Sequence, residues 1–482
     1  MYINDKLVIG KNSEKDICLN LSKACMHGII TGASGSGKTT TLKVMAESFS
    51  DASVPVFLVD IKGDLSGLAF KGLEEGFVPK SVESLGIEDF EYKSFPVTFL
   101  DLYGKKGHSV RTTVAGVGAD LLAKMLNLTD AQEGILSIVF KIAKDENLKL
   151  IDLKDLKEIL TYCLENKNKY TGIYGNITSQ SIGTIQRNIL VLERDGGDFF
   201  FGKPDFDLKD LMHYDANTGK GYINVFNAEE LFKTPSLYAV FLVWLLTSIY
   251  NNFEEVGSIK KPKLVLFFDE AHLIFSEMPA NIIKQITGIV KLIRSKGVGV
   301  YFISQSPSDI PGEVLAQLGN KIQHVLRSYT PAEEKKVKAA ASSFRSNPKF
   351  DMISEIKSLK TGEALISFLD ENGEPSITEK AFVVPPQSRV GVITDTERMN
   401  LITSGHLYNK YKDLIDEESA FEILSSRKEK VEEKKETKKE EKKSTKKKKD
   451  SVAEKYAKKI ANSTASTIGR KIGNSIFKSL FK

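Results

Sequence analysis

Eight residues near the start of the chain, GASGSGKT at 32–39, restrict its fold more than any other stretch. They match G-x-x-x-x-G-K-[ST] and lie between a short apolar run and a segment with helical periodicity, as this motif requires. The glycines let the backbone bend tightly and direct N–H groups towards phosphate oxygens, beside the positive end of the following helix. The stretch therefore predicts a nucleotide phosphate loop in an α/β domain, and a glycine-rich turn that binds nothing is the weaker alternative.

Several positions of this loop have an expected chemical role. Lys38 is expected to pair with the β and γ phosphates, and the hydroxyl of Thr39 is expected to bind Mg²⁺. The residues predicted to surround the phosphates are Gly32, Ala33, Ser34, Gly35, Ser36, Gly37, Lys38, Thr39 and Thr40.

A phosphate loop also needs carboxylates for Mg²⁺ and for the attacking water, and two apolar runs end in an aspartate. VFLVD ends at Asp60, whereas LVLFFDE supplies the adjacent pair Asp269 and Glu270. Two acids at one strand end can divide the metal and base roles, so we expect Asp269 to bind Mg²⁺ and Glu270 to accept a proton from water. Asp60 with Gly63 also fits the D-x-x-G of GTPases, but no N/T-K-x-D motif accompanies it.

Four further polar residues follow these acids. Gln305 ends the apolar run YFISQ, where it is expected either to sense the γ-phosphate or to be a plain polar strand end. Arg294 and Arg327 flank that run, and an arginine from a neighbouring subunit often neutralises phosphoryl-transfer charge. Taken alone, each arginine is expected to be a surface residue. His272 is expected to pack or support rather than to catalyse.

The order of these patterns predicts an α/β fold, with a mostly parallel sheet flanked by helices and interrupted by an all-helical insertion. The predicted parts are 1–107, the first part of the core; 108–215, the helical insertion; 216–394, the rest of the core with a C-terminal hairpin; 395–426, a helical extension; 427–450, a disordered Lys/Glu-rich linker; and 451–482, a basic amphipathic helix.

Charge is distributed unevenly along the chain. Residues 427–450 hold 13 basic and 7 acidic residues, and residues 451–482 hold 7 basic and 1 acidic. Since the whole chain has a net charge of only +5, the remainder is acidic. The segment 451–482 is therefore a candidate for contact with a membrane surface, a protein groove or nucleic acid, and a solvated helix is the alternative.

Targeting and membrane signals are weak. The three cysteines form no CxxC pair, and the first residues lack the basic and apolar regions of a signal peptide. The longest apolar run, 237–250, falls short of the roughly 20 residues needed to cross a bilayer. We therefore predict a cytoplasmic protein without a transmembrane segment.

The phosphate loop, the double-acid strand and the strand ending in Ser304 and Gln305 occur in an order that resembles the HerA/FtsK superfamily of hexameric P-loop motor ATPases. The bacterial HerA-like family labelled YjgR is the more similar group. The resemblance runs from about residue 5 to residue 425 and is carried by HGIITGASGSGKTTTLK, VPVFLVDIKGDLSGLA, YGNITSQSIGTIQRNIL, KPKLVLFFDEAHLIF, VKLIRSKGVGVYFISQSP, LGNKIQHVLRSYTP and VPPQSRVG.

This resemblance implies a RecA-like ATPase core that assembles into a homo-oligomeric ring, with a hexamer favoured, and binds ATP and Mg²⁺ at subunit interfaces. It implies Gln305 as a sensor, Arg294 as the first candidate for an arginine finger and Arg327 as the second. It also implies translocation on DNA. HerA itself works with a nuclease partner, but the expected absence here of a substantial N-terminal docking barrel does not support that partnership.

Two other functions are compatible with parts of the sequence. A nucleotide-dependent oligomeric scaffold would use ATP slowly and act on a protein or membrane partner through its basic tail. A DEAH-box helicase is a weaker alternative, because that class requires a second RecA-like domain after Asp269 and the chain has one further core segment there.

Overall fold

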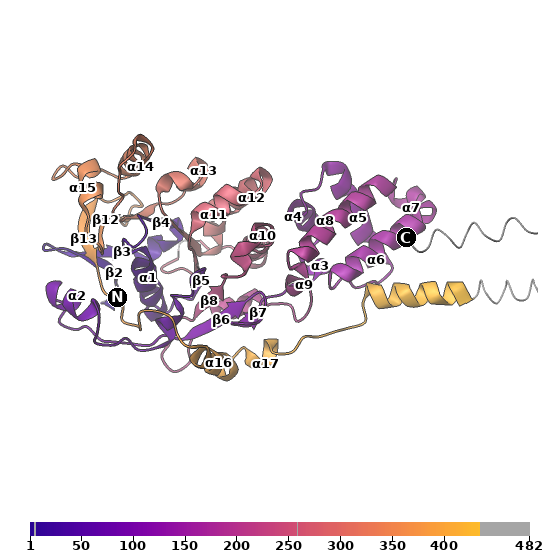
Figure 1. Cartoon of the computed structure of the whole chain (residues 1–482), viewed down its shortest axis with the longest axis horizontal. Helices are drawn as coiled ribbons and strands as arrows, with labels where there is room; N and C mark the ends of the chain where they lie inside the picture. Colours follow the sequence, from indigo (N-terminus) through magenta and orange to yellow (C-terminus); the bar gives the residue numbers. More distant parts are fainter. Residues whose placement is uncertain (4–5, 258, 434–482) are drawn as a thin grey trace, which may run out of the picture. The chain divides into compact units, whose positions relative to one another are not determined.

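The computed structural model describes residues 1–3, 6–257 and 259–433. Residues 1–420 form one compact unit, and the described residues 421–433 lie outside it. The first unit contains one mixed sheet of 13 strands, flanked by helices (Figure 1). This confirms the predicted α/β fold.

Eight neighbouring strands of this sheet are parallel. Their apolar residues are buried on both faces, as expected for a parallel sheet covered by helices. In spatial order the strands are β11 (Asn320–Gln323), β4 (Gly28–Thr31), β10 (Val298–Ser304), β9 (Leu264–Phe268), β5 (Val56–Asp60), β8 (Ile223–Asn227), β6 (Val97–Asp101) and β7 (His108–Ser109).

The register of the central strands brings their carboxyl ends to one edge of the sheet. Ser304 of β10 lies beside Thr31 of β4, and Phe268 of β9 lies beside Phe302 of β10. Val59 of β5 also lies beside Phe268. The residues that directly follow these strands therefore share the carboxyl edge of the sheet, where ligands of open α/β sheets bind.

An antiparallel extension continues the sheet beyond β11. A hairpin of β12 (Glu363–Ser367) and β13 (Glu379–Val383) follows β11, and β2 (Lys6–Lys11) pairs with β13. The two remaining strands, β1 (Tyr2–Ile3) and β3 (Asp16–Leu19), both pair with β2.

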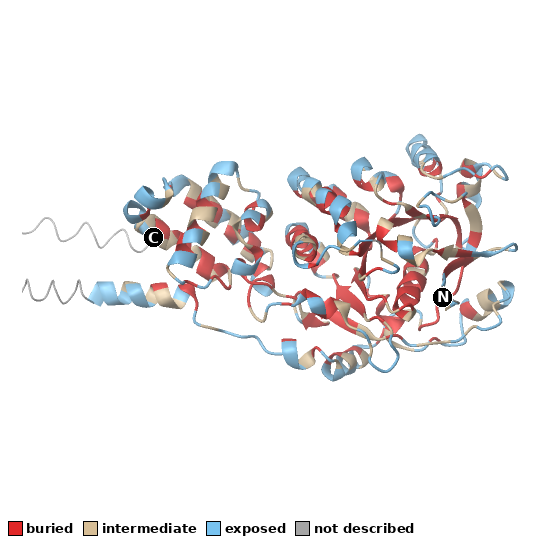
Figure 2. Cartoon of the chain, turned by 180° about the vertical axis from the view of Figure 1, so that it is seen from behind, coloured by how far each residue is buried: buried red, intermediate tan, exposed pale blue. Residues whose placement is uncertain are grey.

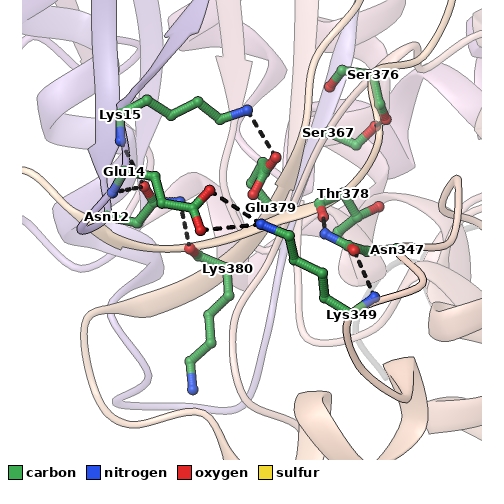
Figure 3. Close-up of polar contacts among 10 residues, drawn as sticks. All are labelled: Asn12, Glu14, Lys15, Asn347, Lys349, Ser367, Ser376, Thr378, Glu379 and Lys380. Carbon is green, nitrogen blue, oxygen red and sulfur yellow. Dashed lines mark hydrogen bonds and ion pairs between the residues drawn. The ribbon is translucent and has the colours of Figure 1, made fainter.

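Ion pairs hold the turn between β2 and β3 against this extension. Glu14 accepts two hydrogen bonds from Lys349, both at 3.1 Å, and Lys15 pairs with Glu379 of β13 at 2.8 Å (Figure 3). The side chains of Glu14 and Lys349 are 62% and 65% exposed, so this pair contributes little stability by itself.

Helices cover both faces of the parallel strands, which form the buried centre of the molecule (Figure 2). On one face, Phe49 of α1 (Lys38–Asp51) packs on Phe267 and Tyr301, with ring centroids 6.2 Å away in both cases. On the other face, Phe241 of α10 (Pro235–Asn252) stacks on Phe226 at 4.3 Å. Adjacent strand residues point to opposite faces, so each strand contributes to both cores.

Helices of the expected insertion lie between β7 and β8. They carry apolar residues three and four apart, and these residues are buried among the helices. The helices are α3 (Val114–Val117), α4 (Ala119–Met125), α5 (Asp130–Asp145), α6 (Leu153–Glu165), α7 (Lys167–Tyr174), α8 (Ser179–Arg194) and α9 (Gly197–Phe200).

The C-terminal part of the described chain is helical. After β13 come α16 (Asp395–Ser404), α17 (Tyr408–Tyr411) and a helix over residues 420–433. Residues 427–433, predicted to begin a disordered linker, are thus helical, while the rest of that linker and the basic segment 451–482 lie outside the described residues. Within the described residues, no helix is both long and apolar enough to cross a membrane.

Candidate active site

The phosphate loop joins the carboxyl end of β4 to the first turn of α1, as its sequence predicts. Gly35 and Gly37 have φ values of 73° and 115°, a region that side-chain-bearing residues rarely adopt. These two glycines let the loop curl in front of α1. The backbone N–H groups of the first turn of α1 then point towards the position where a phosphate would bind.

Lys38 lies across the loop that it follows. Its Nζ donates to the carbonyl oxygens of Gly32 at 2.8 Å and Ala33 at 3.1 Å. Burial lowers the pKa of Lys38, and the charges of Glu270 and Asp269 oppose that shift. The ammonium thus occupies the loop itself and lies within electrostatic range of the two acids.

β11 anchors the phosphate loop from the side. The Ala33 N–H donates to the Val325 carbonyl at 2.8 Å, and the buried ring of His324 lies between α1 and β12. His324 Nδ1 lies 2.9 Å from the carbonyl oxygen of Glu363, and its Nε2 lies 2.8 Å from the hydroxyl of Thr41. Burial lowers the pKa of His324 to about 4, so the ring carries one proton near neutral pH. A carbonyl only accepts, so that proton is on Nδ1 and Nε2 accepts from the Thr41 hydroxyl. His324 is therefore a neutral support of the loop that sequence reasoning missed.

Asp269 and Glu270 directly follow β9, two strands away from the phosphate loop and on the same edge. Asp269 accepts the backbone N–H of Glu270 at 2.8 Å. Burial, and then the charge of Glu270, raise the pKa of Asp269 to about 6. Glu270 has φ 48° and ψ 43°, a left-handed conformation that costs a non-glycine residue roughly 1–2 kcal/mol. The two acids lie where the sequence places them, and the second one is strained.

Asp60 ends the neighbouring strand β5 but is engaged by its own loop. Its carboxylate accepts the N–H of Gly63 at 2.7 Å and that of Leu65 at 3.2 Å. Burial, and then the charge of Asp64, raise the pKa of Asp60 to about 7. Of the two competing aspartates, Asp60 therefore shapes the loop 61–65, which carries a contact to Glu270.

That contact is an ion pair that sequence reasoning missed. Lys62 Nζ donates to Glu270 Oε1 at 2.6 Å, and His272 Nδ1 lies 3.4 Å from Glu270 Oε2. The sequence held one signal of this contact: VFLVD and LVLFFDE both end predicted strands. If two parallel strands are neighbours in the sheet, the loops that follow them lie close together. His272 is thus beside the second acid, in a supporting position.

The other predicted residues divide between the two edges of the sheet. Gln305 directly follows β10 and is exposed at the carboxyl edge, between the phosphate loop and the acids. Arg327 is exposed and lies two residues beyond Val325, which bonds the phosphate loop. Arg294 lies at the opposite, amino edge: it precedes β10, and its Nη1 lies 3.0 Å from Sδ of Met26, just before β4.

Buried polar atoms without hydrogen-bond partners gather around the acids and the loop. Among the described residues they include Ser36 Oγ, Asp64 Oδ1, Tyr238 OH and Glu270 Oε2. Such atoms cost free energy unless a ligand or water satisfies them. Oxygen donors beside a phosphate loop suit Mg²⁺, which takes one or two protein ligands and completes its shell with phosphates and water. The residues present therefore fit a magnesium nucleotide.

Relatives of known description are DNA double-strand break repair helicases HerA. The protein of Sulfurisphaera tokodaii is 25% identical over 372 residues, which cover 74% of this chain and 66% of the relative. That of Saccharolobus solfataricus is 23% identical, with 74% and 64% covered. The chain thus spans just under two thirds of the length of these relatives.

Solved structures of a coupling protein share the fold. The bacterial conjugative coupling protein TrwBdeltaN70 has a TM-score of 0.50 at 15% identity, with 78% of this chain and 90% of that one covered. TrwB in complex with the non-hydrolysable GTP analogue GDPNP also has a TM-score of 0.50 at 15% identity, with 77% and 87% covered. This likeness identifies the core as a RecA-like P-loop fold.

One family model accounts for nearly the whole chain. It describes the helicase HerA-like C-terminal family, and it matches residues 5–482. The phosphate loop, the two acids after β9 and all strands of the sheet except β1 lie within that range. The chain therefore belongs to the helicase HerA-like C-terminal family.

Proposed function

We propose that the chain is a Mg²⁺-dependent ATP hydrolase that assembles into a ring, with six subunits favoured, and moves or remodels DNA. The observation that carries the hydrolase is the shared carboxyl edge of β4 and β9, which brings a complete phosphate loop and two adjacent acids to one side of the sheet. The DNA substrate rests on the curated relatives, which are DNA repair helicases.

Each group at this edge has one role in the proposed reaction. Lys38 leaves the carbonyls of Gly32 and Ala33 and binds the β and γ phosphates, which offer it full negative charges in their place. Thr39 and Asp269 would hold Mg²⁺, which when bound would neutralise phosphate charge. Glu270 accepts the proton of the attacking water, and Gln305 holds that water or the γ-phosphate.

The position of Arg294 supports an oligomer. It lies at the amino edge, whereas the phosphate loop lies at the carboxyl edge of the same strand β4. Four residues of parallel strand span about 13 Å, so Arg294 does not reach the site of its own subunit and acts on that of a neighbour. Arg327 lies on the edge of its own phosphate loop, and we propose it as a residue that acts within its subunit.

The test uses the full chain and its Lys38→Ala variant. We expect Mg²⁺-dependent ATP hydrolysis that the variant loses, stimulation by DNA that weakens as salt rises, and a mass that increases with ATP. Absence of ATP hydrolysis by the wild type would overturn the proposed hydrolase activity. Hydrolysis that ignores single- and double-stranded DNA at every salt concentration overturns DNA as the substrate and favours a scaffold acting on a protein or membrane.

A further inference from the structure

The ion pair between Lys62 and Glu270 joins the neighbouring strands β5 and β9 across the proposed catalytic edge. The separation of Lys62 Nζ and Glu270 Oε1 is 2.6 Å, typical of a charge-assisted hydrogen bond. A carboxylate that acts as general base must approach the attacking water within hydrogen-bonding distance. In this pose one oxygen of Glu270 is already bound to an ammonium, and the pair fixes where the carboxylate points.

The pair is built so that it can break. The Lys62 side chain is 53% exposed while that of Glu270 is only 11% exposed, so water competes for the ammonium but reaches little of the carboxylate. Ion pairs of this exposure are weak, corresponding to a factor of about five in an equilibrium constant. The left-handed backbone of Glu270, at φ 48°, adds strain that a rotation of this residue would release.

A second partner for Lys62 lies on its own loop. Asp64 is two residues further along, and its Oδ1 is buried with no hydrogen-bond partner among the described residues. Burial raises the pKa of Asp64, and the charge of Lys62 opposes that rise, so the ammonium acts electrostatically on this carboxylate. The ammonium therefore has three carboxylates within its electrostatic range, those of Glu270, Asp269 and Asp64. Asp269 already accepts the Glu270 N–H and is the proposed metal ligand, whereas Asp64 keeps a buried oxygen without a partner among the described residues.

Hydrogen bonds hold the backbone of loop 61–65 in place, so only the side chain of Lys62 has to move for it to change partner. Asp60 accepts two backbone N–H groups of the loop, and the Ser66 hydroxyl donates to the Gly63 carbonyl at 2.9 Å. Lys62 has four rotatable side-chain bonds, so its ammonium can change partner while the backbone stays in place.

We propose that Lys62 is a positioning residue that holds Glu270 in a resting pose, and that it transfers to Asp64 when the site is engaged for hydrolysis. This inference deepens the proposed function and rests on it. The transfer frees Oε1 of Glu270 to receive the proton of water, and it gives the buried Asp64 oxygen a partner. The resting and the hydrolysing site thus differ in whether Lys62 pairs with Glu270 or with Asp64.

Two variants shift this balance in opposite directions. Lys62→Met keeps an unbranched side chain and removes its charge, so we expect kcat without DNA to rise about fivefold, with KM for ATP within about twofold of wild type. Asp64→Asn removes the negative charge of the second partner, so we expect the DNA-stimulated kcat to fall by a similar factor. Lys62→Arg retains the pair, and its rate without DNA should stay below that of Lys62→Met.

A lysine of the same edge serves as the matched control. Lys105 pairs with Glu230 at 2.8 Å, with side-chain exposures of 60% and 48%, and neither residue contacts Glu270. Lys105→Met should leave the rate without DNA and KM unchanged. Adding Glu270→Gln to Lys62→Met should abolish the gain, because the gain passes through that carboxylate.

Three results overturn the inference while the wild type remains an active hydrolase. A tenfold rise in KM for ATP with a lower kcat in Lys62→Met would make Lys62 a phosphate ligand. Unchanged kinetics in that variant, or an equal gain in Lys105→Met, would show that the pair does not restrain Glu270. An inactive wild type would overturn the proposed function first, so the two failures are distinguishable.

Discussion

Around β4, β9 and β10, the two edges of the central sheet contain similar polar groups but satisfy them differently. At the amino edge, the Val300 N–H donates to Nδ1 of His27 at 3.0 Å, and Nε2 lies 2.9 Å from the Val290 carbonyl. Tyr301 donates its hydroxyl to the Ala24 carbonyl at 3.0 Å. At the carboxyl edge, Ser36 Oγ and Glu270 Oε2 are buried without hydrogen-bond partners among the described residues.

This difference separates the scaffold from the reactive side. Polar groups that are fully bonded to the protein rigidify a fold, whereas groups left unbonded cost stability unless a ligand completes them. The strained Glu270 and the Lys62 pair belong to the second kind. Changes at the carboxyl edge should therefore alter rates, and changes inside the amino edge should alter stability.

The largest effect is expected from Glu270→Gln. An amide cannot accept the proton of water, so we expect kcat to fall by about 10⁴-fold, at the upper end for loss of a general base. ATP binding should remain, because Lys38 and the phosphate loop are untouched. Steady-state hydrolysis and equilibrium nucleotide binding would measure both. A kcat within tenfold of wild type would remove Glu270 from the base role.

Arg294 is the exception to the rule that the carboxyl edge sets rates and the amino edge sets stability. It is an exposed residue of the amino edge with a predicted catalytic role, and Arg294→Ala tests that role. We expect kcat to fall by about 10³-fold, the lower range for loss of an arginine finger, with the melting temperature nearly unchanged. ATP hydrolysis and thermal unfolding would be compared in one preparation. Loss of stability with normal kcat would make Arg294 structural like its neighbours.

The buried ring of His27 should make stability depend on pH. Burial lowers the pKa of His27 from 6.5 to about 4, so between these values the unfolded chain binds a proton that the native chain does not. The free energy of unfolding should therefore fall as pH decreases from 6.5 to 4, by about 3 kcal/mol from this group.

Urea unfolding of wild type and His27→Asn at several pH values would isolate that contribution. Asparagine does not titrate, so the variant lacks this group's pH dependence whatever its stability at any one pH. The wild type should lose about 3 kcal/mol more than the variant across the window. Equal losses would show that His27 is not held neutral by the fold.

A smaller effect is expected from Gly28→Ala, at the amino end of β4. A Cβ there would lie 2.4 Å from the Tyr301 ring and 2.7 Å from the Asn320 carbonyl, so the strands must shift. We expect unfolding to become easier by about 2 kcal/mol, with KM for ATP unchanged. Gly134→Ala in α5 meets no atom within 4 Å and should stabilise by up to about 1 kcal/mol. Equal effects would contradict a tightly packed amino edge.

Local patterns were sufficient to predict the fold and the first groups of the site. The glycines and Lys38 predicted a strand, a loop and a helix, and the apolar run before Asp269 predicted a buried central strand. Each of these signals is contained in fewer than about twenty residues, because phosphate loops and buried strands are specified by their own sequence.

The contacts that tune the site were not predictable in this way. Lys62 and Glu270 are 208 positions apart, and Thr41 and His324 are 283 apart. Such pairs depend on which strands become neighbours, and strand order does not follow chain order here. The edge on which Arg294 lies likewise became clear only from the pairing of β10 with β4.

In the proposed ring, one subunit's carboxyl edge and another's amino edge form each working site. The direct test mixes Lys38→Ala with Arg294→Ala subunits in equal amounts, after exchange between rings. Each parent is inactive, but about a quarter of the mixed interfaces join an intact phosphate loop to an intact Arg294.

We predict that ATP hydrolysis returns in this mixture to about a quarter of the wild-type rate, if sites act independently. A mixture of Lys38→Ala with Glu270→Gln should stay inactive, because both changes damage sites that need the two residues in one subunit. Failure of the first mixture to exceed its parents, with ring assembly confirmed by mass, would contradict the account.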